Sequence, residues 1–137
     1  MHYLVTGGAG FIGSHLTHAL LNQGHQVTIL DDLSTGKYEN ISPRAKFIKG
    51  SITDAHIVTP AFENIDGCFH LAAIASVARS NEEWRLTHEV NLSGTIQLFE
   101  AAKARKTPVV CASSAAVYGE GHIPPFHEEL MPTPLSA

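Results

Sequence analysis

The sequence predicts an α/β fold built on a doubly wound parallel sheet, with about five strands in the order 3-2-1-4-5. Short apolar runs alternate with segments of helical periodicity, a pattern typical of parallel strands joined by helices. A glycine-rich turn with the sequence TGGAGFIG follows the first run, and two aspartates follow the second. This succession is typical of a strand, a tight turn, a helix and a second strand that bind a ligand at the edge of the sheet.

The first strand is expected at residues 3–6, and the first helix begins after the turn, at Phe11, where leucine and alanine recur at helical spacing. Glycine permits a sharp turn at Gly7, close approach of a ligand diphosphate at Gly10, and close packing of helix on strand at Gly13. The free N–H groups at the start of the helix favour an anionic ligand. Gly7, Gly10 and Gly13 fit the pattern G-x-x-G-x-x-G, and Gly8, Gly10 and Gly13 fit the pattern G-x-G-x-x-G equally well. The glycines alone therefore do not decide between the two spacings.

The second strand, residues 27–30, ends in Asp31 and Asp32. Asp31 lies 18 residues after Gly13, and an acid at about this distance hydrogen-bonds the 2′-hydroxyl of an adenosine ribose in dinucleotide-binding folds. A carboxylate would repel a 2′-phosphate, and no arginine stands beside it, so the predicted cofactor is NAD rather than NADP. In the plainer interpretation, the two aspartates only cap the turn that follows.

The middle of the chain continues the alternation of strands and helices. Residues 33–43 are polar and are expected to form irregular structure over the adenosine half of the cofactor. A third strand is predicted at 45–49, a short helix disturbed by Pro60 at 54–64, and a fourth strand at 67–73. The fourth strand ends in small residues, which permit either close approach of a ligand or close packing of strand and helix.

A long helix is predicted at residues 82–106, with apolar side chains on more than one face. A covering helix from this chain or another subunit is therefore expected, and we predict a homodimer through this helix. Gly94 indicates close approach of another segment. A fifth strand is expected at 109–112, and four prolines within residues 120–137 predict a loop. A complete dinucleotide fold has a sixth strand, so this fold is expected to be incomplete.

The composition, with 44% hydrophobic residues and a net charge of −4, is that of a globular domain and argues against a nucleic-acid partner. No signal-peptide leader and no apolar stretch of membrane-spanning length is present, so a cytoplasmic location without membrane attachment is expected. Cys68 and Cys111 stand in apolar runs and are predicted to be buried. The nine histidines show no recurring ligand spacing, although His15 and His18 share a helix face, so no metal site is predicted.

Five motifs occur in the order TGGAGFIG, DDLSTG, HLAA, NLSGT and SSAAVYG. In this combination the whole chain resembles the extended short-chain dehydrogenase/reductase family, and within it the NAD-dependent sugar-nucleotide epimerases of the UDP-glucose 4-epimerase type. The resemblance implies a Rossmann-like fold and selects the glycine spacing that starts at Gly7. It also implies a nucleotide sugar, a UDP-sugar, as the substrate.

The resemblance further implies roles for individual residues. Asp31 would hold the adenosine ribose, Asn91 would buttress the site from the long helix, and Ser114 would be the catalytic serine that hydrogen-bonds the sugar hydroxyl to be oxidised. The cofactor-binding residues expected from the turn and from the likeness are Gly7, Gly10, Phe11, Ile12, Gly13, Asp31, Asp32, Ser34, Thr35, Gly36, Ser51, Ile52, Leu71, Ala72, Ala73 and Asn91.

Several positions depart from the pattern of relatives. Ser51 stands where relatives usually carry an aspartate for the adenine amino group, so adenine is expected to be held more weakly or by the backbone at Ile52. Ala75 replaces a polar or basic side chain near the cofactor. Two alanines follow Ser114 where sugar-nucleotide 4,6-dehydratases carry an acid and a base, so epimerisation or simple reduction remains.

The general base of the family, the tyrosine of a Tyr-x-x-x-Lys helix, would follow Ala137. Tyr118 does not fit, because His122 rather than a lysine lies four residues further on. We therefore expect residues 1–137 to be the NAD-binding domain of a nucleotide-sugar epimerase, ending before the catalytic helix and the sugar-binding domain and inactive alone. The alternatives are a non-catalytic NAD-binding sensor or scaffold, and a family reductase that acts on another carbonyl.

Overall fold

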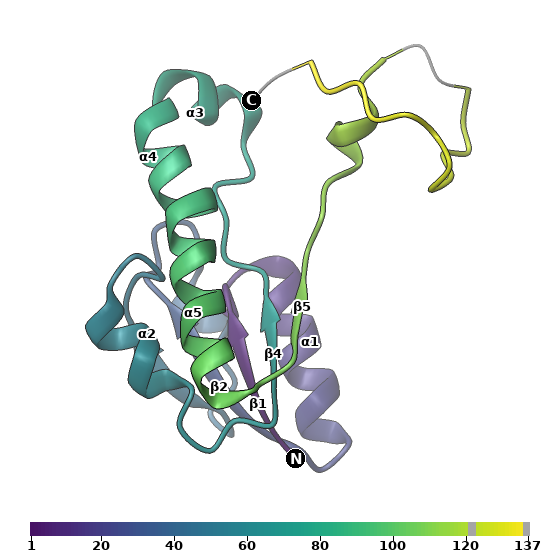
Figure 1. Cartoon of the computed structure of the whole chain (residues 1–137). Helices are drawn as coiled ribbons and strands as arrows, with labels where there is room; N and C mark the ends of the chain where they lie inside the picture. The colour runs from purple at the N-terminus through teal and green to yellow at the C-terminus, as the bar shows by residue number, and fades with distance from the viewer. Residues whose placement is uncertain (121–122, 136–137) are drawn as a thin grey trace.

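In the computed structural model, which describes residues 1–120 and 123–135, five parallel strands form one sheet in the order β3-β2-β1-β4-β5 (Figure 1). The strands are β1 (His2–Thr6), β2 (Gln26–Asp31), β3 (Lys46–Lys49), β4 (Gly67–His70) and β5 (Val109–Cys111). The predicted fold class and strand order are confirmed. Thr6 pairs in register with Leu30 on one side and His70 on the other, so the carboxyl ends of three strands meet at one edge of the sheet.

Helices cover both faces of the sheet (Figure 1). On one face α1 (Phe11–Asn22) packs through a buried cluster of Val5, Leu20, Leu21, Val27 and Ile29. On the other face lie α2 (Ala55–Ala61) and α5 (Thr95–Arg105), whose buried cluster includes Leu4, Val58, Phe62, Leu98, Ala101 and Ala102. Apolar side chains thus meet the sheet from both layers, as a doubly wound parallel sheet requires.

The helix predicted at residues 82–106 is interrupted. The connections contain η1 (Tyr38–Asn40), α3 (Val77–Glu82), α4 (Trp84–His88), the π-helical η2 (Glu89–Gly94) and η3 (Ala115–Tyr118). Glu83 leaves the helical conformation, with φ −120° and ψ 45°, and the helix then runs through α4, η2 and α5. The close approach expected at Gly94 is present, because a Cβ there would lie 2.9 Å from the side chain of Ile52.

The other predicted elements differ from the structure only at their ends. The short helix α2 begins after Asp54, whose carboxylate accepts a hydrogen bond from the backbone N–H of His56, and it ends one residue past Pro60. The fourth strand ends at His70 rather than at residue 73. The reason is that the N–H of Ala72 turns away from the backbone of β1 and points at the Thr6 side chain.

The two cysteines lie in different environments. Cys68 is buried in β4, as predicted, and burial, together with the nearby Cys111, raises the pKa of its thiol to about 12. The prediction was wrong for Cys111, which is exposed. Its strand, β5, is the last strand of the sheet, and no described element covers its outer side, where Val110 is 61% exposed.

The described part of the predicted tail, residue 120 and residues 123–135, contains neither helix nor strand. This agrees with the loop that its prolines predicted, whereas residues 121–122 and 136–137 lie outside the described residues. Within the described ranges, no helix is both long enough and apolar enough to cross a membrane.

Candidate functional site

A cleft of about 840 Å³ opens at the edge where the carboxyl ends of the strands meet. The turn after β1, the segments after the other four strands, and parts of α4 and η2 line it. All the residues predicted from the sequence line this one cleft, namely Gly7, Gly10, Phe11, Ile12, Gly13, Asp31, Asp32, Ser34, Thr35, Gly36, Ser51, Ile52, Leu71, Ala72, Ala73, Asn91 and Ser114. The fold therefore brings them together, and their individual contacts with a ligand stay predictions.

Two glycines of the glycine-rich turn leave no room for a side chain. Gly7 has a φ of 70°, and a Cβ there would lie 2.8 Å from the backbone nitrogen of Ala72. A Cβ on Gly13 would overlap the carbonyl oxygen of Gly7. Gly10 precedes α1 and offers no side chain to cap it, so the first-turn N–H groups of α1 are available to an anion in the cleft.

Asp31 ties the end of β2 to the glycine-rich turn. Only 8% of the residue is exposed, and its Oδ2 accepts from the N–H of Ala9 at 2.9 Å while its Oδ1 accepts from the N–H of Leu33 at 2.8 Å. The neighbouring Asp32 is exposed and caps the N–H of Ser34 at 2.8 Å. Each carboxylate oxygen of Asp31 has a second lone pair, so the turn contacts leave it able to accept from a ligand hydroxyl as well.

The segment after β3 is held by α5. The Oγ of Ser51 lies 2.9 Å from the Oγ1 of Thr53 and accepts from the N–H of Thr53 at 3.2 Å, so its side chain is already engaged. Gln97 donates from Nε2 to the carbonyl of Ile52 at 2.9 Å. The peptide at Ile52 is thus fixed by α5, a contact that no pattern in the sequence indicates.

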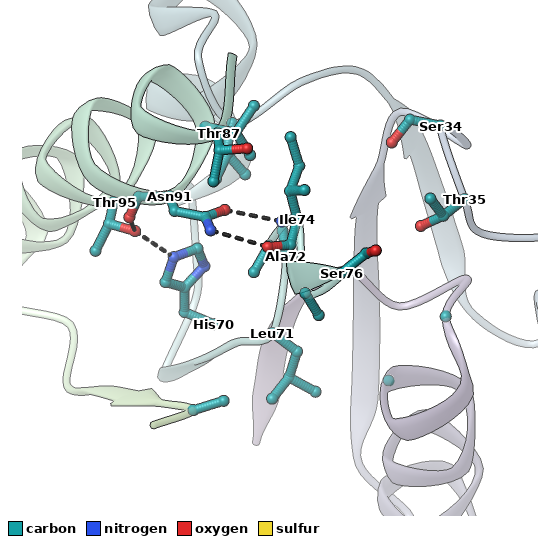
Figure 2. Close-up of a pocket in the computed structure, with 18 of the residues that line it drawn as sticks. Ser34, Thr35, His70, Leu71, Ala72, Ile74, Ser76, Thr87, Asn91 and Thr95 are labelled. Atoms are coloured by element: carbon teal, nitrogen blue, oxygen red, sulfur yellow. Dashed lines mark hydrogen bonds between the residues drawn. The ribbon is translucent and has the colours of Figure 1, made fainter. Parts of the chain in front are cut away.

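A buried histidine lies where β4 meets the cleft (Figure 2). His70 is 3% exposed, its Nδ1 lies 2.7 Å from the Oγ1 of Thr6, and its Nε2 lies 2.9 Å from the Oγ1 of Thr95. Burial lowers the pKa of His70, which favours the neutral ring. Sequence reasoning missed this cluster, because a histidine and threonines within apolar runs look like core residues.

Asn91 holds the loop that follows β4. Its Oδ1 accepts from the N–H of Ile74 at 2.8 Å, and its Nδ2 donates to the carbonyl of the same residue at 3.0 Å (Figure 2). Ser34 and Thr35 lie across the cleft from Asn91 (Figure 2). The loop is thereby anchored to the π-helical segment, and π-helical turns occur often at functional sites.

Ser114 lies at the opposite end of the cleft, on the exposed segment after β5. Its Oγ accepts from the N–H of Ala116 at 3.2 Å and so caps η3. The ring of Tyr118 lies 5.5 Å from that of Phe126. Among the described residues, no hydrogen bond joins Ser114 to a histidine, tyrosine, lysine or carboxylate side chain, and no three potential metal ligands form a cluster.

The chain is similar to one family model, to curated relatives and to solved structures. The family model for the NAD dependent epimerase/dehydratase family matches residues 3–137. The chain is 41% identical over 129 residues to a UDP-N-acetyl-alpha-D-glucosaminuronate decarboxylase of Bacillus cytotoxicus. Among solved structures, it resembles a UDP-glucose 4-epimerase of Thermotoga maritima with UDP-glucose (TM-score 0.95, 37% identity) and a UDP-glucose 4-epimerase of Thermus thermophilus in complex with NAD (TM-score 0.91, 40% identity).

Nearly all of this chain takes part in these matches, 92% of it for the decarboxylase and 99% for each of the two structures. The chain spans less than half of each relative, 40% of the decarboxylase and 46% and 45% of the two epimerases. The similarity therefore concerns one part of these larger proteins.

Proposed function

The chain belongs to the NAD-dependent epimerase/dehydratase family, and from this we propose that residues 1–137 form the NAD-binding domain of a nucleotide-sugar 4-epimerase. One observation carries the proposal: a single cleft joins the glycine-rich turn and Asp31 at one end to Ser114 at the other. A dinucleotide binds in such a cleft, at the carboxyl ends of parallel strands. The similarity to an epimerase in complex with NAD and to another with UDP-glucose supports it.

The turn suits the diphosphate of NAD. A Cβ at Gly7 or Gly13 would meet backbone atoms, whereas Gly10 has only one neighbouring atom near its Cβ position and leaves the cleft side open. The N–H groups of Phe11 and Ile12, in the first turn of α1, would bond to the diphosphate oxygens. Asp31 would accept from the adenosine ribose and would repel a 2′-phosphate, which favours NAD over NADP.

The other end of the cleft would hold the sugar. When bound, NAD would supply the acceptor for a hydride from sugar C4. Ser114 would hydrogen-bond the C4 hydroxyl and keep it in place for that transfer. A serine hydroxyl is too weak a base to take the C4 proton unaided, so we assign that step to the tyrosine of a Tyr-x-x-x-Lys helix outside residues 1–137.

A second copy of the chain is our proposed partner for α4, η2 and α5. Trp84, Leu92, Ile96 and Phe99 lie on these segments and are 72%, 49%, 50% and 44% exposed. The last three follow one another at helical spacing, so they form one apolar stripe, and such stripes mark interfaces. Sedimentation at micromolar concentration should show a dimer, and a monodisperse monomer would remove this part of the proposal.

The catalytic proposal is tested by an epimerisation assay with NAD and UDP-galactose or UDP-N-acetylgalactosamine. One arm contains the purified 137-residue chain, and the other contains a chain extended through the expected catalytic helix and sugar domain. Only the longer chain should interconvert the two sugar epimers, and Ser114→Ala in it should lower the rate by about 10²-fold or more. The matched Ser113→Ala variant should have a much smaller effect.

Each other outcome has a defined meaning. Turnover by the short chain at the rate of the long one would show that the base lies within residues 1–137. NAD binding without any turnover by the longer chain would favour a sensor or scaffold, and reduction of another carbonyl substrate would favour a reductase.

A further inference from the structure

We propose that His70 is a positioning residue: as a neutral ring protonated on Nε2, it locks the loop after β4 to β1 and to the π-helical segment η2. The hydrogen bonds of His70 would keep the cleft in shape, and their expected effect on NAD binding rests on the function proposed above. It follows from the direction of five hydrogen bonds, which the chemistry of their donors and acceptors determines.

The bond between His70 and Thr95 has one possible direction. The Thr95 hydroxyl has a single proton, and it donates that proton to the carbonyl of Asn91 at 2.7 Å, since a carbonyl oxygen can only accept. Its Oγ1 must therefore accept from Nε2 of His70 at 2.9 Å. Nε2 consequently carries a proton.

The bond between His70 and Thr6 follows from the donors around the Thr6 hydroxyl. The Oγ1 of Thr6 accepts from the N–H of Ala72 at 3.3 Å, and it shares the N–H of Leu71, 3.2 Å away, with the Thr6 carbonyl, which accepts that N–H at 3.1 Å. If Nδ1 of His70 were also protonated, its N–H would compete with these donors for one hydroxyl oxygen, and the buried ring would carry a charge, which burial disfavours because it lowers the pKa of His70. The Thr6 hydroxyl therefore donates to Nδ1 at 2.7 Å, and the ring is neutral.

The result is one continuous chain of hydrogen bonds. It runs from the N–H of Ala72 through Thr6, His70 and Thr95 to the carbonyl of Asn91. The side chain of Asn91 adds a second attachment, because it bonds to both the N–H and the carbonyl of Ile74 (Figure 2). The loop is thus held at both Ala72 and Ile74, and the same loop backs onto Gly7 of the glycine-rich turn.

The arrangement also excludes a different role for His70. Both ring nitrogens are occupied within the buried cluster, so the ring has no free lone pair to accept a proton from a sugar. The effect of His70 on a bound ligand would act through the loop.

The tautomer can be measured directly. Nitrogen-15 NMR of the histidine-labelled 137-residue chain at neutral pH distinguishes protonated from unprotonated ring nitrogens, and His70→Gln identifies the signals. We expect protonated Nε2 and bare Nδ1 for His70. An Nδ1–H tautomer or a doubly protonated ring would overturn the proposal. The tautomer is read in the unaltered chain, and His70→Gln serves only to identify the signals.

The positioning effect is tested on Thr95. In Thr95→Val the amide hydrogens of Ala72 and Ile74 should exchange with solvent about tenfold faster, NAD should bind about tenfold more weakly, and Thr95→Ser should restore both. Thr28→Val is the matched control, because it removes a hydroxyl–histidine bond of similar length, 2.8 Å to His2, from the amino-terminal half of β2. Unchanged exchange in Thr95→Val, or equal loop exchange in Thr28→Val, would overturn the role. Failure of the unaltered chain to bind NAD would count against the proposed function and leave the exchange result standing.

Discussion

The two ends of the cleft differ in how much of their structure these residues provide. At the β1–β2 end, Asp31 is 8% exposed and both its carboxylate oxygens hold backbone N–H groups of the adjoining turns. At the β5 end, Ser114 is exposed, and the strand before it, β5, pairs with β4 alone. The turns at the β1–β2 end are therefore tied together by a buried carboxylate, whereas the side chain of Ser114 bonds only to the N–H of Ala116 among the described residues.

The largest effect should come from filling the tight turn at the β1–β2 end. A Cβ in Gly13→Ala would overlap the carbonyl oxygen of Gly7 and lie 2.7 Å from the Cα of Gly8. Because both neighbours are backbone atoms, the helix must shift, so we expect the free energy of unfolding to fall by about 1–3 kcal/mol and NAD binding to be lost. Urea denaturation and calorimetric titration measure the two effects.

The matched variant adds one heavy atom at the open end. Ala115→Ser lies on the exposed segment after Ser114 and should change the free energy of unfolding by less than about 0.5 kcal/mol. Equal losses in the two variants would show that the two ends are equally tightly packed and would remove the contrast between them.

A moderate effect is expected from the pH dependence of stability. Burial lowers the pKa of His70 in the folded chain below the unfolded value of about 6.5, so the unfolded state binds the extra proton first. The contribution of His70 to the free energy of unfolding is fully present above pH 6.5. It is lost as the pH falls below 6.5, and the free energy of unfolding then changes by at most about 1.4 kcal/mol per pH unit. Urea denaturation between pH 5 and 8 should show a shallower slope for His70→Gln, and identical slopes would refute the assignment.

The smallest effect concerns the two thiols and should leave stability unchanged. Burial raises the pKa of Cys68 to about 12, whereas Cys111 is exposed and lines the cleft. A maleimide at pH 7.5 should therefore label Cys111 in the native chain and reach Cys68 only after unfolding. Mass spectrometry of proteolytic peptides reads both sites, and labelling of Cys68 first would show that the core around β4 is open.

Much of the fold and of the β1–β2 end of the cleft follows from local patterns in the sequence. The glycine spacing, the alternation of apolar runs and the position of Asp31 each depend on residues close together in the sequence. The structure confirms the strand order and places the glycines and Asp31 along one cleft, and their contacts with a ligand stay predictions. The helix predicted at residues 82–106 begins after Glu83 in the structure and contains the π-helical segment η2, which helical periodicity in the sequence does not distinguish from an α-helix.

Other features could not be predicted because they depend on contacts between distant residues. The chain of hydrogen bonds through His70 joins residues 64 and 25 positions apart, and no local pattern distinguishes it from ordinary core packing. The exposure of Cys111 depends on β5 being the last strand of the sheet, which an apolar run does not reveal. Gln97 likewise reaches Ile52 across 45 positions.

The central claim is that the β1–β2 end holds NAD through Asp31, and calorimetric titration of NAD and NADP into the purified chain tests it most directly. We predict that NAD binds at least about tenfold more tightly than NADP, since Asp31 should repel the 2′-phosphate. Asp31→Ala should narrow that difference. Asp66→Ala, which removes a carboxylate bonded to the N–H of His2 next to the start of β1, should preserve it. Equal affinities, or tighter binding of NADP, would contradict the account.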